Sequence, residues 1–329
     1  MSVHIVMMLI PSMFINLINF YDLSASSLGL IFSISSFCFG LGSLPMSLLY
    51  NKYGPRVLLV FSQIGIFIAA LLASNSQSIE SFAIFNIFLG LFASIHHPVS
   101  LTLISEVFDK NISKANAFHG VFGSLGVSTG PLLCYYAITN FDWQFSFFLV
   151  AIFNLAIAPI TYFVIPKFKT RESLSALDFK MGNQLKMLQI FFLISLIVGI
   201  VFTIFNTFIP SVFKVAIGDQ SNLFVSGILI FGIFGQVLSG FFGDKFNRIK
   251  LLSIVLMVLC PLFIATYFLS NLSLIAVSVL LAVFMYSIQP LINSIIKDIT
   301  TAKIRSVVFG INFFLMFGVS GLVAALGGL

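Results

Sequence analysis

The chain has 329 residues, of which 59% are hydrophobic and only 8% are charged. Soluble domains carry about 25% charged residues, so this composition and the mean hydropathy of +1.13 exclude a water-soluble globular protein. We therefore expect the lipid bilayer to be the solvent for most of the chain. The net charge of +6 fits the excess of Lys and Arg in cytoplasmic loops of membrane proteins and does not indicate nucleic-acid binding.

A spanning helix needs about 20 apolar residues, and the chain divides into eleven such segments. In chain order, the predicted spans are 3–20, 27–49, 57–74, 81–105, 115–138, 143–165, 187–212, 221–243, 250–269, 272–296 and 306–328. The first segment lacks a basic n-region and a cleavage site, so we interpret it as a short first span and not as a signal peptide.

The basic residues predict the orientation of these spans. When the connections are assigned to alternate sides, fifteen of the sixteen Lys and Arg fall on one side, and only Lys214 falls on the other. The positive-inside rule places the basic side in the cytoplasm. We expect a multi-pass protein of the cell membrane with a cytoplasmic N-terminus.

The longest polar segment, residues 166–186, follows the sixth span. It predicts an all-α protein in three parts: a six-helix bundle over 1–165, a cytoplasmic linker over 166–186 and a five-helix bundle over 187–329. The three cysteines lie far apart in apolar segments, without the spacing of a disulfide framework or a metal site. We expect no cofactor and no metal, and a monomer.

The two halves share a sequence pattern. Corresponding loops follow the second and the eighth span, and they carry Asn51, Lys52, Gly54 and Arg56 in the first half and Gly240, Asp244, Lys245 and Arg248 in the second. His97-Pro98 in the fourth span likewise corresponds to Gln289-Pro290 in the tenth. A repeated helical unit is typical of transporters that bind their substrate near the midplane of the membrane, between the repeats.

These loops resemble the hallmark of the major facilitator superfamily, G-x-L-x-D-R-x-G-R-[RK] after the second helix of each half. The second copy departs from it at Asn247, where glycine is usual, and the first copy has Ser47 for the glycine and Asn51 for the aspartate. The fifth span carries Gly126-x-x-x-Gly130-Pro131, which looks like the glycine-proline motif of the antiporter branches. The stretches Gly90 to Pro98 and His119 to Gly126 are similar, less specifically, to exporters of the fosmidomycin-resistance type.

The resemblance implies two pseudo-symmetric bundles that move a small solute by alternating access, in the direction of efflux, without enzymatic activity. The family has twelve helices and the sequence predicts eleven, so a truncated or inactive homologue is an alternative. A membrane receptor or scaffold that does not transport is another. The resemblance also implies that Asp244 lies at the cytoplasmic start of the fifth span, where a carboxylate is stabilised by the helix dipole. There it would latch the halves together.

The predicted spans contain no Asp or Glu deep in the membrane, with Glu106 near the cytoplasmic end of the fourth. Intramembrane ionisable groups are normally functional, and histidine titrates near neutrality. The candidates for a proton carrier are therefore His96, His97 and His119, and His97 is preferred because it shares a helix face with Ser94 and Ser100. The alternative is a histidine that only lines the cavity and donates hydrogen bonds.

Other polar residues within the spans are either links between helices or contacts to the solute, because buried amides need partners. The main candidates are Asn16, Asn206, Tyr286, Gln289, Asn293 and Asn312. Pro98 and Pro290 each free a backbone carbonyl, so we expect kinks that face the interior and place His97 and Gln289 near a central cavity. A cavity with so little fixed charge suits a neutral, amphiphilic or zwitterionic solute.

Overall fold

The structure is a computed structural model that describes residues 1–167 and 182–323. Most of the predicted linker and the end of the last predicted span lie outside these residues. Within the described ranges the secondary structure is helical, with no strand. The apolar composition explains this, since backbone groups in lipid must be satisfied within the chain itself.

Helices before residue 165 form the first half of the structure. They are α1 (Ser2–Ser12), α2 (Phe14–Tyr21), α3 (Ala25–Ala73), α4 (Ile79–Ala93), α5 (His96–Val107), α6 (Ile112–Asn140) and α7 (Gln144–Val164). Helices after residue 181 form the second half. They are α8 (Gly182–Ile217), η2 (Gly218–Gln220), α9 (Ser221–Leu229), α10 (Gly232–Gly243), α11 (Arg248–Phe268), α12 (Asn271–Ile299), α13 (Arg305–Phe313) and η3 (Phe314–Val319).

Among the described residues, seven helices are long and apolar enough to cross a membrane, or eight if α1 and α2, which meet at 57°, form one span. Two of the seven are too long for one crossing. With about 1.5 Å per residue and a hydrocarbon core of about 30 Å, the 49 residues of α3 and the 59 of Leu185–Gly243 each exceed two core thicknesses. The sequence predicts two spans in each of these two segments.

The break within α3 lies at Gly54, whose φ of 74° is left-handed. A residue without a Cβ is favoured in this conformation, which explains the glycine in the first loop. The second loop turns without a positive φ. Asn247 is extended there, and its side chain accepts a hydrogen bond from Lys250 N at 3.0 Å, which caps α11. The departure from glycine therefore has a structural reason.

The fourth predicted span is divided into α4 and α5 by a turn at Ser94 and Ile95. The turn lies at the carbonyl that Pro98 leaves without its helical donor, as expected for a proline inside a helix. Around Pro290, by contrast, α12 continues without interruption. The kinks predicted for the two corresponding prolines are therefore unequal.

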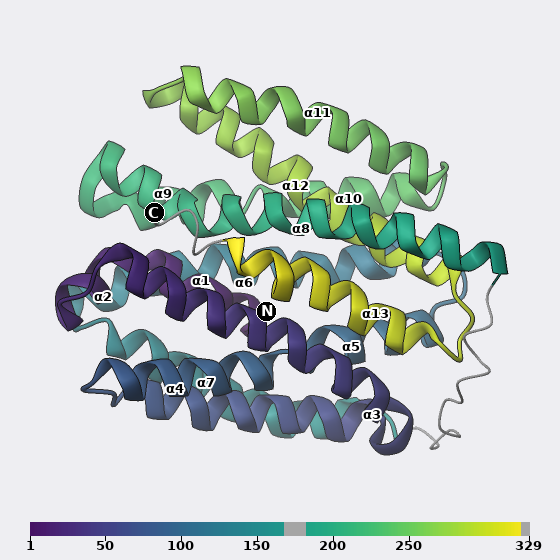
Figure 1. Ribbon diagram of the computed structural model, residues 1–329, viewed down its shortest axis with the longest axis horizontal. Helices are drawn as coiled ribbons and strands as arrows, with labels where there is room; N and C mark the ends of the chain where they lie inside the picture. Colours follow the sequence, from purple (N-terminus) through teal and green to yellow (C-terminus); the bar gives the residue numbers. More distant parts are fainter. Residues whose placement is uncertain (168–181, 324–329) are drawn as a thin grey trace.

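The two halves meet along two lines of contact (Figure 1): α6 packs against α9, α10 and α12, and α3 packs against α13 and η3. Both lines use glycine. A Cβ at Gly240 would lie 2.3 Å from the Cβ of Ala117, and one at Gly40 would lie 2.3 Å from Gly318 Cα. Such small residues permit the close helix approach that stabilises packing in lipid.

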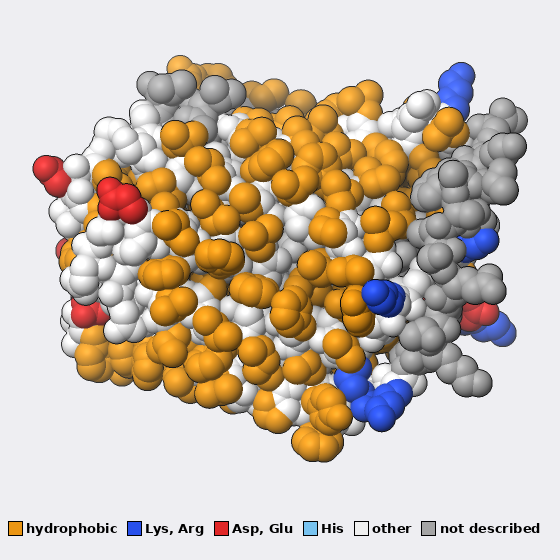
Figure 2. All heavy atoms as spheres, turned by 60° about the horizontal axis from the view of Figure 1, so that its bottom comes forward, with side chains coloured by type: hydrophobic (Ala, Val, Ile, Leu, Met, Phe, Trp, Pro, Cys, Tyr) orange, Lys and Arg blue, Asp and Glu red, His pale blue; other side chains and the backbone are white. Residues whose placement is uncertain are grey.

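Apolar side chains cover the broad middle of the face drawn in Figure 2, and its Lys and Arg gather at one end. Many large apolar side chains of the described residues are exposed, such as Leu30, Phe61, Ile84 and Ile160. An exposed apolar area of this extent needs a nonaqueous surrounding. It is the surface expected of a protein embedded in a bilayer.

Candidate functional site

A small cavity lies between the two halves, at the level where α1, α3 and α4 face α8 and η3. Its volume is about 80 Å³, below the roughly 300–1,000 Å³ of sites that enclose drug-sized ligands. Phe39 from the first half and Phe202 and Phe317 from the second form aromatic walls. The polar lining residues are Ser35, Ser36, Asn86, Thr203, Asn206 and Thr207. None of the residues that line it is charged.

Asn206 is the one candidate amide from the sequence that lines this central cavity. Its Oδ1 accepts a hydrogen bond from Tyr286 Oη at 2.7 Å, and its Nδ2 donates to Phe202 O at 2.9 Å. Tyr286 is buried behind it, against Gly232. The two residues thus form one unit, in which Tyr286 fixes the orientation of the Asn206 amide.

The other candidate amides do not line the cavity. Asn293 and Asn312 are buried, and Asn312 Nδ2 lies 3.4 Å from Met316 Sδ. Gln289 is half-buried. Sequence reasoning missed Asn86, which lines the cavity on α4 and whose Nδ2 donates to Phe82 O at 2.8 Å. The sequence pattern that could have identified Asn86 is an amide inside an apolar helix, the same pattern that made Asn206 a candidate.

The four histidines of the chain form a cluster between α1, α5 and α6. The ring centroids of His97 and His4 lie 4.9 Å apart, and those of His96 and His119 lie 5.5 Å apart. Each ring has a buried nitrogen without a hydrogen-bond partner among the described residues. His4, at the start of the chain, was not among the sequence candidates, and only its residue type marked it.

His97 is linked to the central cavity through aromatic rings. It stacks on Phe313 at 4.6 Å between ring centroids, with an angle of 6° between the planes, and on Phe317 at 6.0 Å and 3°. Phe317 in turn lines the cavity. His97 itself is buried and does not line it. One aromatic side chain of the opposite half, Phe317, therefore lies between His97 and the cavity.

The second-half loop contacts the first half through Asp244. Its carboxylate accepts hydrogen bonds from the backbone N–H groups of Ser113 at 2.9 Å and Lys114 at 3.1 Å, in the first turn of α6. These N–H groups have no partner within the helix, and the helix dipole favours an anion there. Asp244 thus binds the position that the family resemblance implied.

Arg248 extends this contact. Its Nε donates to Ser113 Oγ at 2.9 Å, and its guanidinium pairs with Asp244 at 3.3 Å and with Asp298 at 2.5 Å. Lys245 does not join the network and instead lies 3.9 Å above the ring of Phe241. The loop is therefore tied to α6 by a bidentate carboxylate and one arginine.

The first-half loop makes a different contact. Arg56 Nε donates to Ile165 O, its guanidinium lies 5.2 Å from the ring of Tyr162, and both partners belong to the first half. Lys52 lies 5.1 Å from the ring of Tyr53. Among the described residues, the half-buried Asn51 shows no hydrogen bond to α13.

Contact between the halves at this loop is made instead by the preceding part of α3. Ser43 Oγ donates to Gly310 O at 2.8 Å. A Cβ at Gly310 would lie 2.6 Å from Ser47 Oγ. The two corresponding loops are therefore unequal. The second binds the opposite half through its own carboxylate, whereas α3 before the first loop contacts α13 by packing and one neutral hydrogen bond, with the Arg305 guanidinium donating to Ser105 Oγ of α5 at 3.5 Å.

The two glycines of the predicted glycine-proline motif of α6 pack within their own half. A Cβ at Gly126 would lie 2.3 Å from Met1 O, and one at Gly130 would lie 2.6 Å from Met8 Cβ. α6 continues through Pro131 without interruption. These glycines hold α1 close to α6, and they leave the contact with the other half to Gly240 and its neighbours.

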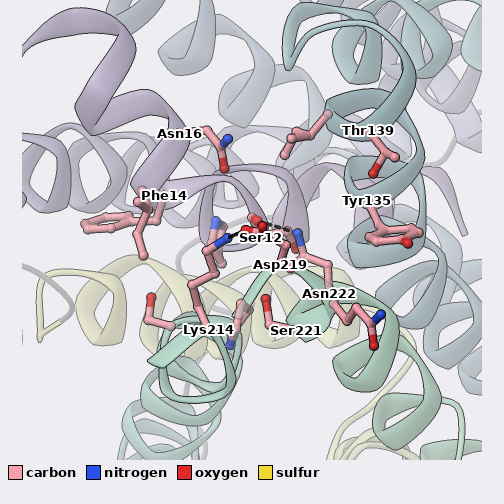
Figure 3. Close-up of a pocket in the computed structure, with 15 residues that line it drawn as sticks. Ser12, Phe14, Asn16, Tyr135, Thr139, Lys214, Asp219, Ser221 and Asn222 are labelled. Atoms are coloured by element: carbon pink, nitrogen blue, oxygen red, sulfur yellow. Dashed lines mark hydrogen bonds and ion pairs between the residues drawn. The ribbon is translucent and has the colours of Figure 1, made fainter. Parts of the chain in front are cut away.

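At the opposite end of α6 from Asp244, a larger cavity of about 460 Å³ opens between the halves (Figure 3). Two of its lining residues connect the halves: Asn222 Nδ2 at the start of α9 donates to Ser12 O at the end of α1, at 2.7 Å. Ser128 Oγ donates to Ser226 O at 2.9 Å, again between the halves. Contacts therefore join the halves on both sides of the central cavity.

Comparisons with known proteins agree with this arrangement. The chain is 24% identical over 249 residues to a probable sugar efflux transporter of Helicobacter acinonychis, covering 73% of this chain and 63% of that protein. It is 22% identical over 160 residues to a probable L-galactonate transporter of Escherichia coli, covering 47% of this chain and 34% of that protein. The alignments thus span less than two thirds of each relative.

Solved structures share the fold at low identity. The human organic anion transporter MFSD10 superposes with a TM-score of 0.80 at 13% identity, covering 99% of this chain and 91% of that one. A bacterial homologue of the human lysosomal transporter Spinster, inward-facing and unoccupied, gives 0.70 at 15%, covering 98% and 78%. The family model of the Major Facilitator Superfamily matches residues 1–325. With this match over nearly its whole length, the chain belongs to the Major Facilitator Superfamily of transporters.

Proposed function

We propose that this protein is a secondary active transporter that moves a small solute across the cell membrane by alternating access. One observation carries the proposal: a cavity lined by both halves lies between two contacts that join them. On one side Asp244 binds the first turn of α6, and on the other Asn222 binds Ser12. Breaking either contact opens the path on one side only. Alternation between the two broken states moves a solute across the membrane without a continuous pore.

The proposed topology has six spans in residues 1–165 and five in 187–329, joined by a cytoplasmic linker. The division of α3 at Gly54 supports it, as do the lengths of the two longest apolar helices. The N-terminus is cytoplasmic, in accord with the distribution of Lys and Arg, and Asp244 then lies on the cytoplasmic side. The protein acts as a monomer on small molecules, without nucleic acid.

Proton coupling is proposed for the histidine cluster. No Asp or Glu lines the central cavity, and four imidazoles gather one ring away from it. His97 is the proposed proton carrier. Its ring contacts those of His4 and His96, and it also stacks on Phe313 of the opposite half. A charge on this ring changes its interaction with Phe313, so protonation and the contact between the halves depend on each other.

The proposed solute is neutral or zwitterionic and rich in hydrogen-bonding groups, and the direction is efflux. The lining of the central cavity consists of hydroxyls, amides and aromatic rings without charge. The relative named as a probable sugar efflux transporter agrees with a polar cargo and with efflux, whereas the relative named as a probable L-galactonate transporter is named for a carboxylate.

The test is flux in proteoliposomes, with a panel of labelled sugars, polyols and neutral antibiotics. We expect at least one solute to exchange in counterflow, and to accumulate when an inward or outward pH gradient is imposed. His97→Gln should retain counterflow and lose the effect of the gradient. The absence of flux for every solute would contradict transport, and a pH-driven flux unchanged in His97→Gln would contradict the proton carrier.

A further inference from the structure

The cavity of about 460 Å³, which we call the outer cavity, is separate from the central one and is lined by both halves. It is lined by the end of α1 and the start of α2, the last turns of α6, the end of α8, and the start of α9. Figure 3 shows Asn16 and Phe14 on one side, Tyr135 and Thr139 on another, and Lys214 and Ser221 from the second half. Its volume of about 460 Å³ falls within the roughly 300–1,000 Å³ of small-molecule sites.

Two buried polar atoms of its lining have no hydrogen-bond partner among the described residues: Ser12 Oγ and Asn222 Oδ1. Both residues are only 7% exposed. An unsatisfied buried polar group costs free energy that a bound hydroxyl would restore. The hydroxyls of Tyr135 and Thr139 and the amide of Asn16 surround the same space.

The charge of the lining is balanced. Lys214 and Asp219 are its two charged residues, and they pair with each other at 2.5 Å. The hydrogen bond from Lys214, and then its charge, lower the pKa of the Asp219 carboxyl below its ordinary value. The Asp219 carboxyl is therefore ionised at neutral pH, and its charge is opposite to that of its partner Lys214. A solute with a net charge finds no uncompensated partner in this space.

The outer and the central cavity are adjacent. Pro11 lines both, and the Asn222–Ser12 hydrogen bond joins two residues of the outer lining, one of which follows Pro11 directly in the chain. The bend of 57° between α1 and α2 follows immediately after these residues. A solute that passes between the cavities must separate Asn222 from Ser12, and those two residues carry the unpartnered atoms.

We propose that the outer cavity is a second solute-binding site, distinct from the central one, and that it takes a neutral polyhydroxylated solute of monosaccharide size. This inference rests on the proposed transport function and names a solute class for it. Asn16, Tyr135 and Thr139 on its wall bind solute hydroxyls, and the buried Ser12 Oγ and Asn222 Oδ1 become available to the solute when the contact between those two residues opens. The solute waits there whenever the Asn222–Ser12 contact is closed.

The test uses side-specific transport kinetics in proteoliposomes of one orientation, with radiolabelled neutral hexoses, pentoses and inositol as probes. The double variant Tyr135→Phe and Thr139→Val removes two hydroxyls with little change of volume. For solute presented at the outer face we expect KM to rise about fivefold or more, at unchanged kcat. For solute presented at the cytoplasmic face, KM should not change.

A matched control is Thr129→Val, on the same helix but away from the cavity, where the hydroxyl donates to its own backbone at Leu125 O. It should leave both KM values unchanged. An unchanged outer KM in the double variant, or an equal rise at both faces, would overturn the outer site while leaving transport in place. Absence of transport in the unmodified protein would instead contradict the proposed function.

Equilibrium binding to the full chain in detergent tests the site independently of flux. With the same neutral probes we expect two bound solutes per chain, and one in the double variant. Galactonate, in which C1 of galactose is oxidised to a carboxylate, should bind at least tenfold more weakly at the outer site. One site in both proteins, or tighter binding of galactonate, would overturn the inference.

Discussion

The imidazole of His97 stacks on the ring of Phe313 at 4.6 Å, with the two planes 6° from parallel. His97 is the second residue of α5, the second part of a broken helix in the first half, and Phe313 ends α13 in the second. The stack therefore crosses between the halves. Because a π-helix follows it at Phe314–Val319, the contact lies next to the kind of helix irregularity that is frequent at functional sites.

Replacing Phe313 by leucine should uncouple transport from the pH gradient. The aromatic face that interacts with a charged imidazole is lost, an interaction of about 0.5–2 kcal/mol, while apolar volume is largely kept. We expect pH-driven accumulation to fall about fivefold with counterflow retained. Phe314→Leu is the control, since Phe314 faces Phe37. Equal effects of the two changes would show that the stack has no special role.

Replacing Asp244 by asparagine should slow the transport cycle without loss of solute affinity. The amide can accept one hydrogen bond from α6 but carries no charge at the helix N-terminus, so the contact between residue 244 and α6 loses about 1 kcal/mol. A population shift of about fivefold follows, to be measured as counterflow rate and as binding affinity.

The matched control for that change is Asp142→Asn. Asp142 Oδ1 also accepts a backbone N–H at the start of a helix, from Phe145 at 3.0 Å, but within one half. It should leave the counterflow rate unchanged. If Asp244→Asn transports at the rate of the unmodified protein, the contact does not control access.

Removing the hydroxyl of Tyr286 should weaken solute binding in the central cavity. Asn206 loses the donor that orients its amide, and the loss of one neutral hydrogen bond amounts to about 0.5–1.5 kcal/mol. We expect Tyr286→Phe to raise KM about threefold to tenfold at both membrane faces. Tyr267→Phe, at an exposed tyrosine of α11, should have no effect.

Gly227 and Gly235, eight positions apart, should differ in their tolerance of a methyl group. A Cβ at Gly235 would lie 1.9 Å from the backbone carbonyl oxygen of Val283, whereas one at Gly227 meets nothing within 4 Å. We expect Gly235→Ala to lower stability by about 1–3 kcal/mol. Gly227→Ala should stabilise by up to about 1 kcal/mol. The midpoint of thermal unfolding in detergent measures both, and equal midpoints would contradict the packing at Gly235.

The helical class and the family followed from the sequence because composition and loop motifs are local properties. The place of Asp244 followed as well, since its neighbours in sequence fix it at a helix boundary. The sequence predicts a kink from Pro98, and the fourth span is divided at Ser94 and Ile95. In each of these cases the physical cause lies within a few residues of the effect.

Other features depend on contacts between distant segments. His4 joins His97 because α1 packs on the glycines of α6, and no pattern within α1 indicates that neighbour. Among the amides, Asn206 lines the cavity and Asn312 does not, a distinction set by helix rotation and not by residue type. The role of each histidine in proton movement stays a prediction.

The inequality of the two loops has a kinetic consequence. Asp244 and Arg248 hold α6 with ionic hydrogen bonds, whereas Ser43 and Gly310 hold α3 to α13 with one neutral bond and close packing. Two joints of different strength do not release together. On the proposed cytoplasmic placement of Asp244, we expect α3 to separate from α13 at a lower cost in free energy than α6 from the second loop, so that the path on that side opens more widely along α3 than along α6.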